Sequence, residues 1–262
     1  MNGKIIFRFH KRLDVCRSRI EMLHRLNPKM GIYGIGEESN YLQAKKHLGD
    51  LLEDIYFIKN KSKKWKWMNG DLTIRQWYLE RGHRLKFDFI YNVEWDMLFF
   101  KPLDAFCKGI PRDGIALTGL VRLKKVEKRW YWTKGERKDE WKELLGIARS
   151  KLHYHGSPYA SIGSGFRIPR KFLEFYSRLN VPELCHDELR MPLFGQLSGL
   201  KLYDTRFFKW FDRKEYAFFN AIKKPISAKA IKTELKRHSG RRAFHPYYFK
   251  WRDLVQNKAF KA

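Results

Sequence analysis

Two carboxylates one residue apart lie inside one of the most apolar segments of the chain, FDFIYNVEWDMLFFKPL, residues 87–103. In an extended segment, residues i and i+2 project to the same side, so Glu94 and Asp96 face one way. Two ionised carboxylates held together repel each other unless a cation lies between them or one is protonated. A hard cation such as Mg²⁺ or Mn²⁺ binds carboxylate oxygens and leaves positions open for phosphate oxygens. The pair therefore indicates a metal site, and two separate surface salt bridges are the alternative.

The residues before this pair predict an alternation of strands and helices. Apolar, β-rich runs predict strands over 4–9, 29–36, 54–58 and 87–93, and helical spacing of apolar residues predicts helices over 14–26, 40–52 and 70–82. Asn27-Pro28 ends the first helix, and Gly82 follows the third as a C′ residue. Such alternation is typical of an α/β fold with a mostly parallel sheet, in which ligands bind beyond the carboxyl ends of the strands. Glu94 and Asp96 lie at such an end.

The second half of the chain has a different character. Residues 122–145 are dense in charged and aromatic residues and are expected to form an excursion over the surface. In residues 159–176, Gly163 and Gly165 allow the backbone to approach a ligand closely, or form an ordinary turn before a helix that begins near Arg170. Asp187 and Glu188 lie at an expected helix start, where acidic residues also occur for capping and dipole reasons.

The composition limits the class of protein. Hydrophobic residues make up 44% of the chain, so it can bury a core, and 55 Lys and Arg against 28 Asp and Glu give a net charge of +27. Such a surface attracts nucleic acid, anionic lipid or phosphorylated small molecules. Three scattered cysteines favour a reducing compartment, and there is neither a signal-peptide core nor a run of about 20 apolar residues. We expect a cytoplasmic protein, with peripheral binding to the inner face of the membrane as one interpretation of its charge.

The strand, the acid-x-acid triplet and the following apolar run with Lys-Pro-Leu resemble the D-x-D region of GT-A glycosyltransferases. The resemblance is one of order and local pattern from Lys4 to about Tyr248, and Glu94 stands where the family has its first Asp. It implies a single Rossmann-like GT-A domain over 1–262, with a nucleotide-sugar-binding half (1–103), an acceptor-binding half (104–248) and a basic tail (249–262). It also implies Mn²⁺ or Mg²⁺, a UDP- or GDP-sugar donor and a glycan or lipid-linked acceptor.

The resemblance further implies roles for single residues. Asp96 and Glu94 would bind the metal together with His245, the late histidine of AFHPYYF, although a histidine there can equally be a packed residue. Asp187, or else Glu188, would be the general base of an inverting reaction. Asp71 can equally be a helix cap, and His153 and His155 lack a third ligand for a zinc site. The expected donor contacts are Phe9, His10, Asn69, Asp71, Glu94, Trp95, Asp96, Gly163, Ser164, Gly165 and Arg167.

Two other functions remain open from the residues. Basic runs with interleaved aromatics, such as KKWKWM and YYFKW, fit a nucleic-acid-binding protein, but no known motif of that class appears and a buried acid pair has no role there. A metal-dependent phosphotransferase or nuclease would need further converging acids. We therefore expect no nucleic-acid partner. The basic surface itself fits an anionic membrane, an acidic glycan, or a compositional bias towards Lys and Arg.

Overall fold

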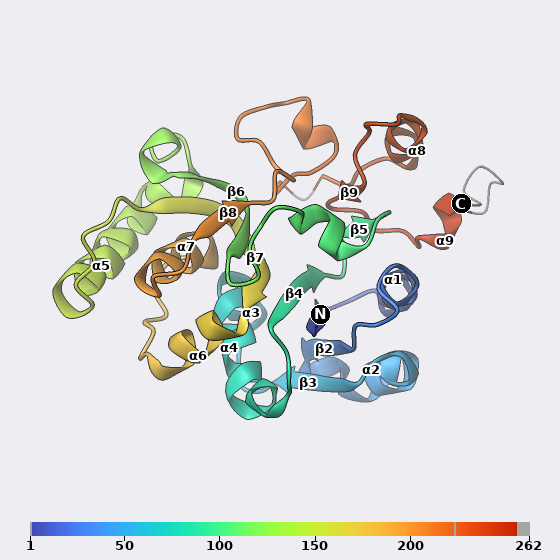
Figure 1. Ribbon diagram of the computed structural model, residues 1–262, viewed down its shortest axis with the longest axis horizontal. Helices are drawn as coiled ribbons and strands as arrows, with labels where there is room; N and C mark the ends of the chain where they lie inside the picture. Colours follow the sequence, from blue (N-terminus) through green and yellow to red (C-terminus); the bar gives the residue numbers. More distant parts are fainter. Residues whose placement is uncertain (1, 223, 256–262) are drawn as a thin grey trace. The chain divides into compact units, whose positions relative to one another are not determined.

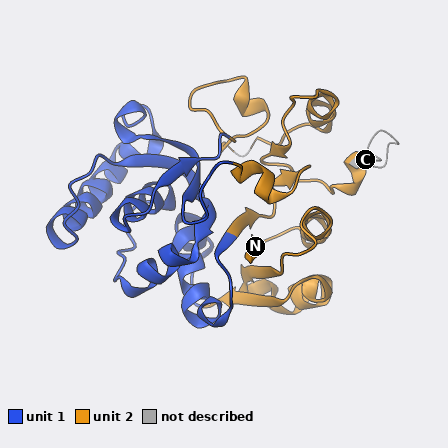
Figure 2. Cartoon of the chain, in the orientation of Figure 1, with its two compact units in different colours: residues 1, 60–90, 109–206 blue, residues 2–59, 91–108, 207–262 orange. Residues whose placement is uncertain are grey.

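The computed structural model describes residues 2–222 and 224–255 (Figure 1). The chain forms two compact units, and each is assembled from segments far apart in the sequence (Figure 2). The first unit contains residues 60–90 and 109–206, and the second contains 2–59, 91–108 and the described part of 207–262.

The second unit begins with three parallel strands, β1 (Gly3–Arg8), β2 (Ile32–Glu37) and β3 (Asp54–Ile58). Their register places Ile5 beside Ile32 and Tyr33 beside Asp54. Helices α1 (Leu13–Leu26) and α2 (Tyr41–Leu48) connect them, so the expected strand-helix alternation is confirmed. Helix α1 ends at Asn27 as predicted, and the side-chain amide of Asn27 donates to the Leu23 carbonyl.

Strand β4 (Phe89–Glu94) begins in the first unit and continues into the second. The chain turns at Trp95 and Asp96, and the Trp95 N–H donates to the Arg8 carbonyl at the end of β1. Two short strands of the second unit, β5 (Leu98–Phe99) and β9 (Ala243–Phe244), pair antiparallel. The second unit also contains helices α8 (Ala228–Lys236) and α9 (Arg252–Val255).

The first unit carries β6 (Ile115–Arg122), β7 (Tyr159–Pro169) and β8 (Leu202–Asp204). Strand β6 pairs antiparallel with β7 and parallel with β8. Among the described residues, seven strands follow one another in the order β3-β2-β1-β4-β7-β6-β8, which is the mostly parallel α/β sheet that the sequence predicted. The helices of this unit are α3 (Lys63–Met68), α4 (Gly70–Glu80), α5 (Glu136–Lys151), α6 (Arg170–Arg178) and α7 (Asp187–Leu197).

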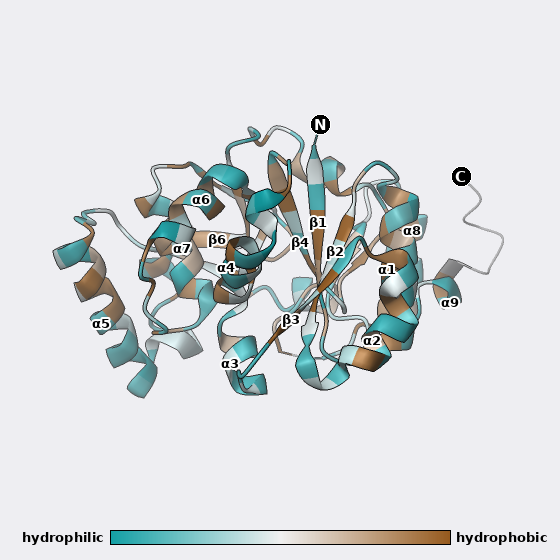
Figure 3. Cartoon of the chain, turned by 90° about the horizontal axis from the view of Figure 1, so that it is seen from below, coloured by the Kyte–Doolittle hydropathy of each residue, from teal (hydrophilic) through white to brown (hydrophobic). Residues whose placement is uncertain are grey.

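Parts of the second half differ from the expectation. Residues 122–145 are not a simple surface excursion, because they contain most of the 16-residue helix α5, which buries Trp141 and Leu144 (Figure 3 shows teal and brown residues alternating along this helix). The glycine-containing stretch is the 11-residue strand β7, in which Gly163 and Gly165 adopt φ values of +70° and +93°. Positive φ is strained for other residues, and the β6–β7 register shifts in this region.

The three cysteines are buried and free, which agrees with the absence of a disulfide framework. None of the helices in residues 2–222 and 224–255 is long and apolar enough to cross a lipid bilayer. Of the expected basic tail, residues 256–262 lie outside the described part of the chain.

Candidate metal centre and acidic cluster

Three predicted metal ligands come together in the second unit. One ligand atom from each of Glu94, Asp96 and His245 lies within 4.8 Å of the others. Glu94 is the last residue of β4, Asp96 lies in the turn that follows, and His245 comes directly after β9. Backbone bonds fix the histidine segment, since His245 N–H donates to the Phe218 carbonyl. Residues about 150 positions apart in the sequence thus form one oxygen- and nitrogen-containing ligand set.

The polar atoms of this triad fit a divalent cation. Asp96 Oδ1 is buried and has no hydrogen-bond partner among the described residues, and His245 Nε2 lies 3.5 Å from it. His245 Nδ1 lies 2.8 Å from the Asn220 carbonyl oxygen, which fixes the tautomer and leaves Nε2 available. Metal-binding histidines usually donate their second N–H to such a carbonyl.

The pKa values reflect the close contact of acid and imidazole. Burial by itself raises the pKa of Asp96, but the charge of His245, whose Nε2 lies 3.5 Å from Oδ1, outweighs burial and holds the pKa below its usual range. Burial lowers the pKa of His245, and the charge of Asp96 outweighs that effect and raises it to about 9. In the absence of a cation, the imidazolium therefore neutralises the carboxylate.

Glu94 also pairs with Arg8, and we expect it to contribute less to metal binding than Asp96. Its Oε1 lies 3.3 Å from Arg8 Nη1, and its side chain is 38% exposed, against 12% for Asp96. We expect Glu94→Gln to weaken Mn²⁺ binding by about tenfold, because an amide oxygen can still coordinate while one negative charge is lost. Isothermal titration with Mn²⁺ measures the change. If Glu94→Gln lost as much Mn²⁺ affinity as the matched Asp96→Asn variant, Glu94 would be as important a ligand as Asp96, and the expectation would be wrong.

Aromatic rings and a cation lie beside the triad in the same unit. Trp95 stacks on Tyr248 with ring centroids 5.4 Å apart, and Lys11 Nζ lies 5.2 Å from the Trp95 ring centroid. The ring of His10 meets Trp95 edge-on at 5.6 Å, and Phe9 is buried. The structure thus brings predicted donor contacts together. Sequence reasoning missed Tyr248 and Asn220, although Tyr248 belongs to the AFHPYYF motif.

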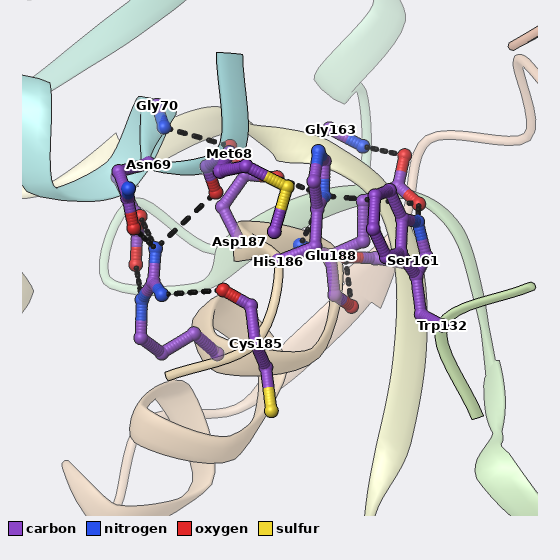
Figure 4. Close-up of polar contacts among 12 residues, drawn as sticks. Met68, Asn69, Gly70, Trp132, Ser161, Gly163, Cys185, His186, Asp187 and Glu188 are labelled. Atoms are coloured by element: carbon purple, nitrogen blue, oxygen red, sulfur yellow. Dashed lines mark hydrogen bonds and ion pairs between the residues drawn. The ribbon is translucent and has the colours of Figure 1, made fainter. Parts of the chain in front are cut away.

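In the first unit, three titratable residues gather at the start of α7 (Figure 4). His186 Nδ1 lies 2.8 Å from Asp187 Oδ1 and 4.0 Å from Glu188 Oε2. Asp187 Oδ2 accepts from the Gly70 N–H at 3.1 Å. Glu188 accepts from the Gly163 N–H at 3.0 Å and from Trp132 Nε1–H at 2.8 Å. Both predicted acids are therefore buried and hydrogen-bonded, which leaves their role as base a prediction.

The pKa values of Glu188 and His186 are both raised, for different reasons. Burial raises the pKa of Glu188, and the neighbouring His186 only partly opposes it. Burial lowers the pKa of His186, but the charge and hydrogen bond of Asp187 outweigh burial, so its pKa is also raised. A carboxyl group with a raised pKa can exchange protons nearer neutral pH than an ordinary glutamate.

The predicted donor contacts Asn69 and Asp71 lie in a buried network of the first unit. Arg190 donates to Asp71 through Nε at 2.7 Å and Nη2 at 2.5 Å, and to Asn69 Oδ1 at 2.8 Å. Tyr176 Oη donates to Asp71 at 2.6 Å. Although burial alone raises the pKa of Asp71, the Arg190 guanidinium holds it below the usual range. The structure gives both residues a stabilising role, and contact with a base or ribose remains a prediction.

The remaining predicted contacts lie on β7. Ser164 is buried, and the Gly163 N–H is used by Glu188. Arg167 is 4% exposed, donates to the carbonyls of Ile110 and Pro111, and so is engaged with backbone. His153 and His155 are exposed, and neither belongs to the metal cluster found among the described residues.

No protein-family model and no curated protein matches the sequence. Among solved structures, the chain is similar to the galactosyltransferase LgtC in complex with donor and acceptor sugar analogues, at 14% identity and a TM-score of 0.41 over 76% of this chain and 72% of that one. It is also similar to 4-diphosphocytidyl-2C-methyl-D-erythritol synthase from Anaerococcus prevotii, at 11% identity and a TM-score of 0.41 over 82% of this chain and 92% of that one. A third similar structure is mouse xyloside xylosyltransferase 1, at 10% identity and a TM-score of 0.39 over 78% of this chain and 85% of that one.

Proposed function

We propose that this protein is a metal-dependent glycosyltransferase of the GT-A type, which moves a sugar from a UDP- or GDP-sugar to a hydroxyl group of a glycan or lipid-linked acceptor. The observation that carries the proposal is the Glu94, Asp96 and His245 ligand set at the end of β4, in which a buried Asp96 oxygen has no hydrogen-bond partner among the described residues. The acid-x-acid spacing and the late histidine agree with the family resemblance of the sequence.

These three residues would hold Mn²⁺ or Mg²⁺, which supplies electrostatic stabilisation of the negative charge that develops on the leaving nucleoside diphosphate. Lys11 lies over the stacked rings of Trp95 and Tyr248, so a nucleotide bound beside these rings has a cation close to it. In our proposal, Lys11 attracts the phosphates and the two rings orient the nucleotide.

We propose Asp187 as the base that takes the proton of the acceptor hydroxyl, with Glu188 as the alternative. The reaction then inverts the anomeric configuration, because the hydroxyl attacks the sugar carbon directly. The raised pKa of Glu188, caused chiefly by burial, supports the alternative. Comparing the pH–rate profiles of Asp187→Asn and Glu188→Gln distinguishes the two, because only loss of the base removes the acidic limb.

The net charge of +27 supports attraction to an anionic surface that presents the acceptor. We propose an anionic membrane face as this surface. Sedimentation with vesicles that contain phosphatidylserine, compared with neutral vesicles at low and high salt, measures the attraction directly.

A panel of UDP- and GDP-sugars tests the proposed function. We expect one donor class to raise the melting temperature in the presence of Mn²⁺ but not in the presence of EDTA. At a donor concentration of a hundredfold over Kd, binding adds about 2.7 kcal/mol to the free energy of unfolding. Slow metal-dependent hydrolysis of the same donor should accompany the shift. Tight, salt-sensitive binding of RNA without any response to sugar nucleotides would instead support the nucleic-acid-binding alternative.

A further inference from the structure

We propose that His186, together with Trp67 and Trp132, forms a binding subsite for a neutral pyranose ring, which is the acceptor sugar of the reaction. The inference deepens the proposed function and rests on it. It concerns the first unit alone, and it adds His186, Trp67 and Trp132 to the residues for which the sequence predicted a role.

His186 carries a polar atom that needs a partner. Its Nδ1 faces Asp187 at 2.8 Å, so the nitrogen that remains is Nε2 (Figure 4). The residue is 6% exposed, and Nε2 has no hydrogen-bond partner among the described residues. A buried polar group without a partner is unfavourable, and a bound ligand that supplies a partner recovers this free energy. His186 Nδ1 also accepts from the Glu188 N–H at 3.3 Å, and a ring whose Nδ1 accepts carries its proton on Nε2, which makes Nε2–H a donor.

Aromatic rings enclose this histidine. The Trp132 ring stacks on His186 with centroids 4.2 Å apart and planes 17° apart, and Trp132 is held by its bond to Glu188. Trp67 meets the His186 ring at 5.3 Å and Trp132 at 5.5 Å, yet Trp67 is 49% exposed. Large aromatic surface open to solvent beside convergent polar groups is typical of a ligand site. The C–H face of a pyranose can lie on Trp67 while one of its hydroxyl oxygens accepts from His186.

The charges favour a neutral ligand over an anionic one. His186 is balanced by Asp187, and Glu188 adds a second carboxyl group at 4.0 Å. Two arginines of this region already have acidic partners: Arg190 pairs with Asp71, and Arg137, which lies over the Trp132 ring, pairs with Glu140. A phosphate or carboxylate would meet the carboxyl groups of Asp187 and Glu188, whereas a hydroxyl group brings no charge.

Binding of methyl glycosides to the full chain tests the inference. The probes are methyl α-D-glucopyranoside, methyl β-D-galactopyranoside and methyl α-D-mannopyranoside, and saturation-transfer NMR detects their ring protons. We expect binding of at least one probe, weakened about tenfold in Trp67→Ala and in His186→Ala, which corresponds to about 1.4 kcal/mol. His186→Gln keeps an N–H donor and should restore most of the affinity. Because Trp67 is half-exposed, its variant reports on the site without emptying the core.

The controls are His155→Ala, which removes an exposed histidine of the same unit, and Tyr41→Ala, which removes an exposed aromatic ring; both should bind as the wild type does. Three results would overturn the inference: no saturation transfer from any probe, equal binding by wild type and both site variants, or tighter binding of methyl β-D-glucuronide than of the neutral probes. The measurement needs neither donor nor metal. If the glycosides do not bind but the sugar-nucleotide panel gives the expected response, the subsite is refuted and the proposed function stands.

Discussion

Asp96→Asn abolishes binding of Mn²⁺ at concentrations that saturate the wild type, with an expected loss of affinity of roughly 100-fold or more. The expectation follows from the position of this carboxylate, whose Oδ1 is buried beside His245 without a hydrogen-bond partner among the described residues. Even residues that only orient metal ligands contribute about 10–100-fold to affinity, so a direct ligand with a charge should contribute at least as much. Electron paramagnetic resonance of free Mn²⁺ measures the loss without any substrate.

The matched control is Asp14→Asn, because Asp14 is an acid of the same unit whose side chain is 49% exposed. It should bind Mn²⁺ as the wild type does. Since Asn is nearly isosteric with Asp, the melting temperature of Asp96→Asn shows whether the fold is retained. Unchanged Mn²⁺ affinity in a folded Asp96→Asn protein would refute the metal site.

Arg190→Met destabilises the protein by about 3–5 kcal/mol, which is the range for removing one partner of a buried ion pair. The side chains of Arg190 and Asp71 are both fully buried, and the guanidinium makes two hydrogen bonds to the carboxylate. Methionine fills much of the volume but leaves Asp71 with Tyr176 Oη as its main side-chain donor. At about 2–4 °C per kcal/mol for a chain of this size, the melting temperature should fall by roughly 6–20 °C.

Lys142→Met is the control, because the Lys142–Asp139 pair lies on the surface with side chains 63% and 76% exposed. Exposed pairs contribute little, so its melting temperature should stay close to that of the wild type. The pH dependence provides a further test. Because Arg190 lowers the pKa of Asp71, the stabilisation is complete above the ordinary carboxyl range near pH 4 and is lost as the pH falls through the lowered value. The gap between wild type and Arg190→Met should therefore narrow in acid, and a gap that is constant with pH would contradict this role.

Local patterns in the sequence determined most of the longer elements before residue 100. The helical spacing of Val15, Ile20 and Leu23 and the proline after Asn27 predicted α1, and the run DIYFI coincides with β3. Such patterns report on burial of one face, which is a local property. The order of Glu94, Asp96 and His245 along the chain also predicted a shared metal site, and the three side chains lie close together in the structure.

Where sequence reasoning failed, non-local contacts decided the result. Helix α5 has a high charge density that hides its apolar stripe, and only packing of Trp141 and Leu144 in the first unit makes it part of a core. The glycines of 159–169 suggested either close approach of the backbone to a ligand or a turn before a helix, and pairing with β6 made this segment a strand. Helix α3 was not expected, because its six residues are too few to show a period.

By itself, the sequence determined the alternating elements and the position of Glu94 and Asp96 at a strand end, because both depend on residues close together in the chain. Only the tertiary structure decided which side chains those acids meet. It placed His245 beside Asp96, which lies about 150 residues earlier in the chain, and it paired Asp71 with Arg190, which lies 119 residues later. It also left His186 Nε2 buried without a partner among the described residues. Charge partners and desolvation set the chemistry of each group, and both are properties of the folded chain.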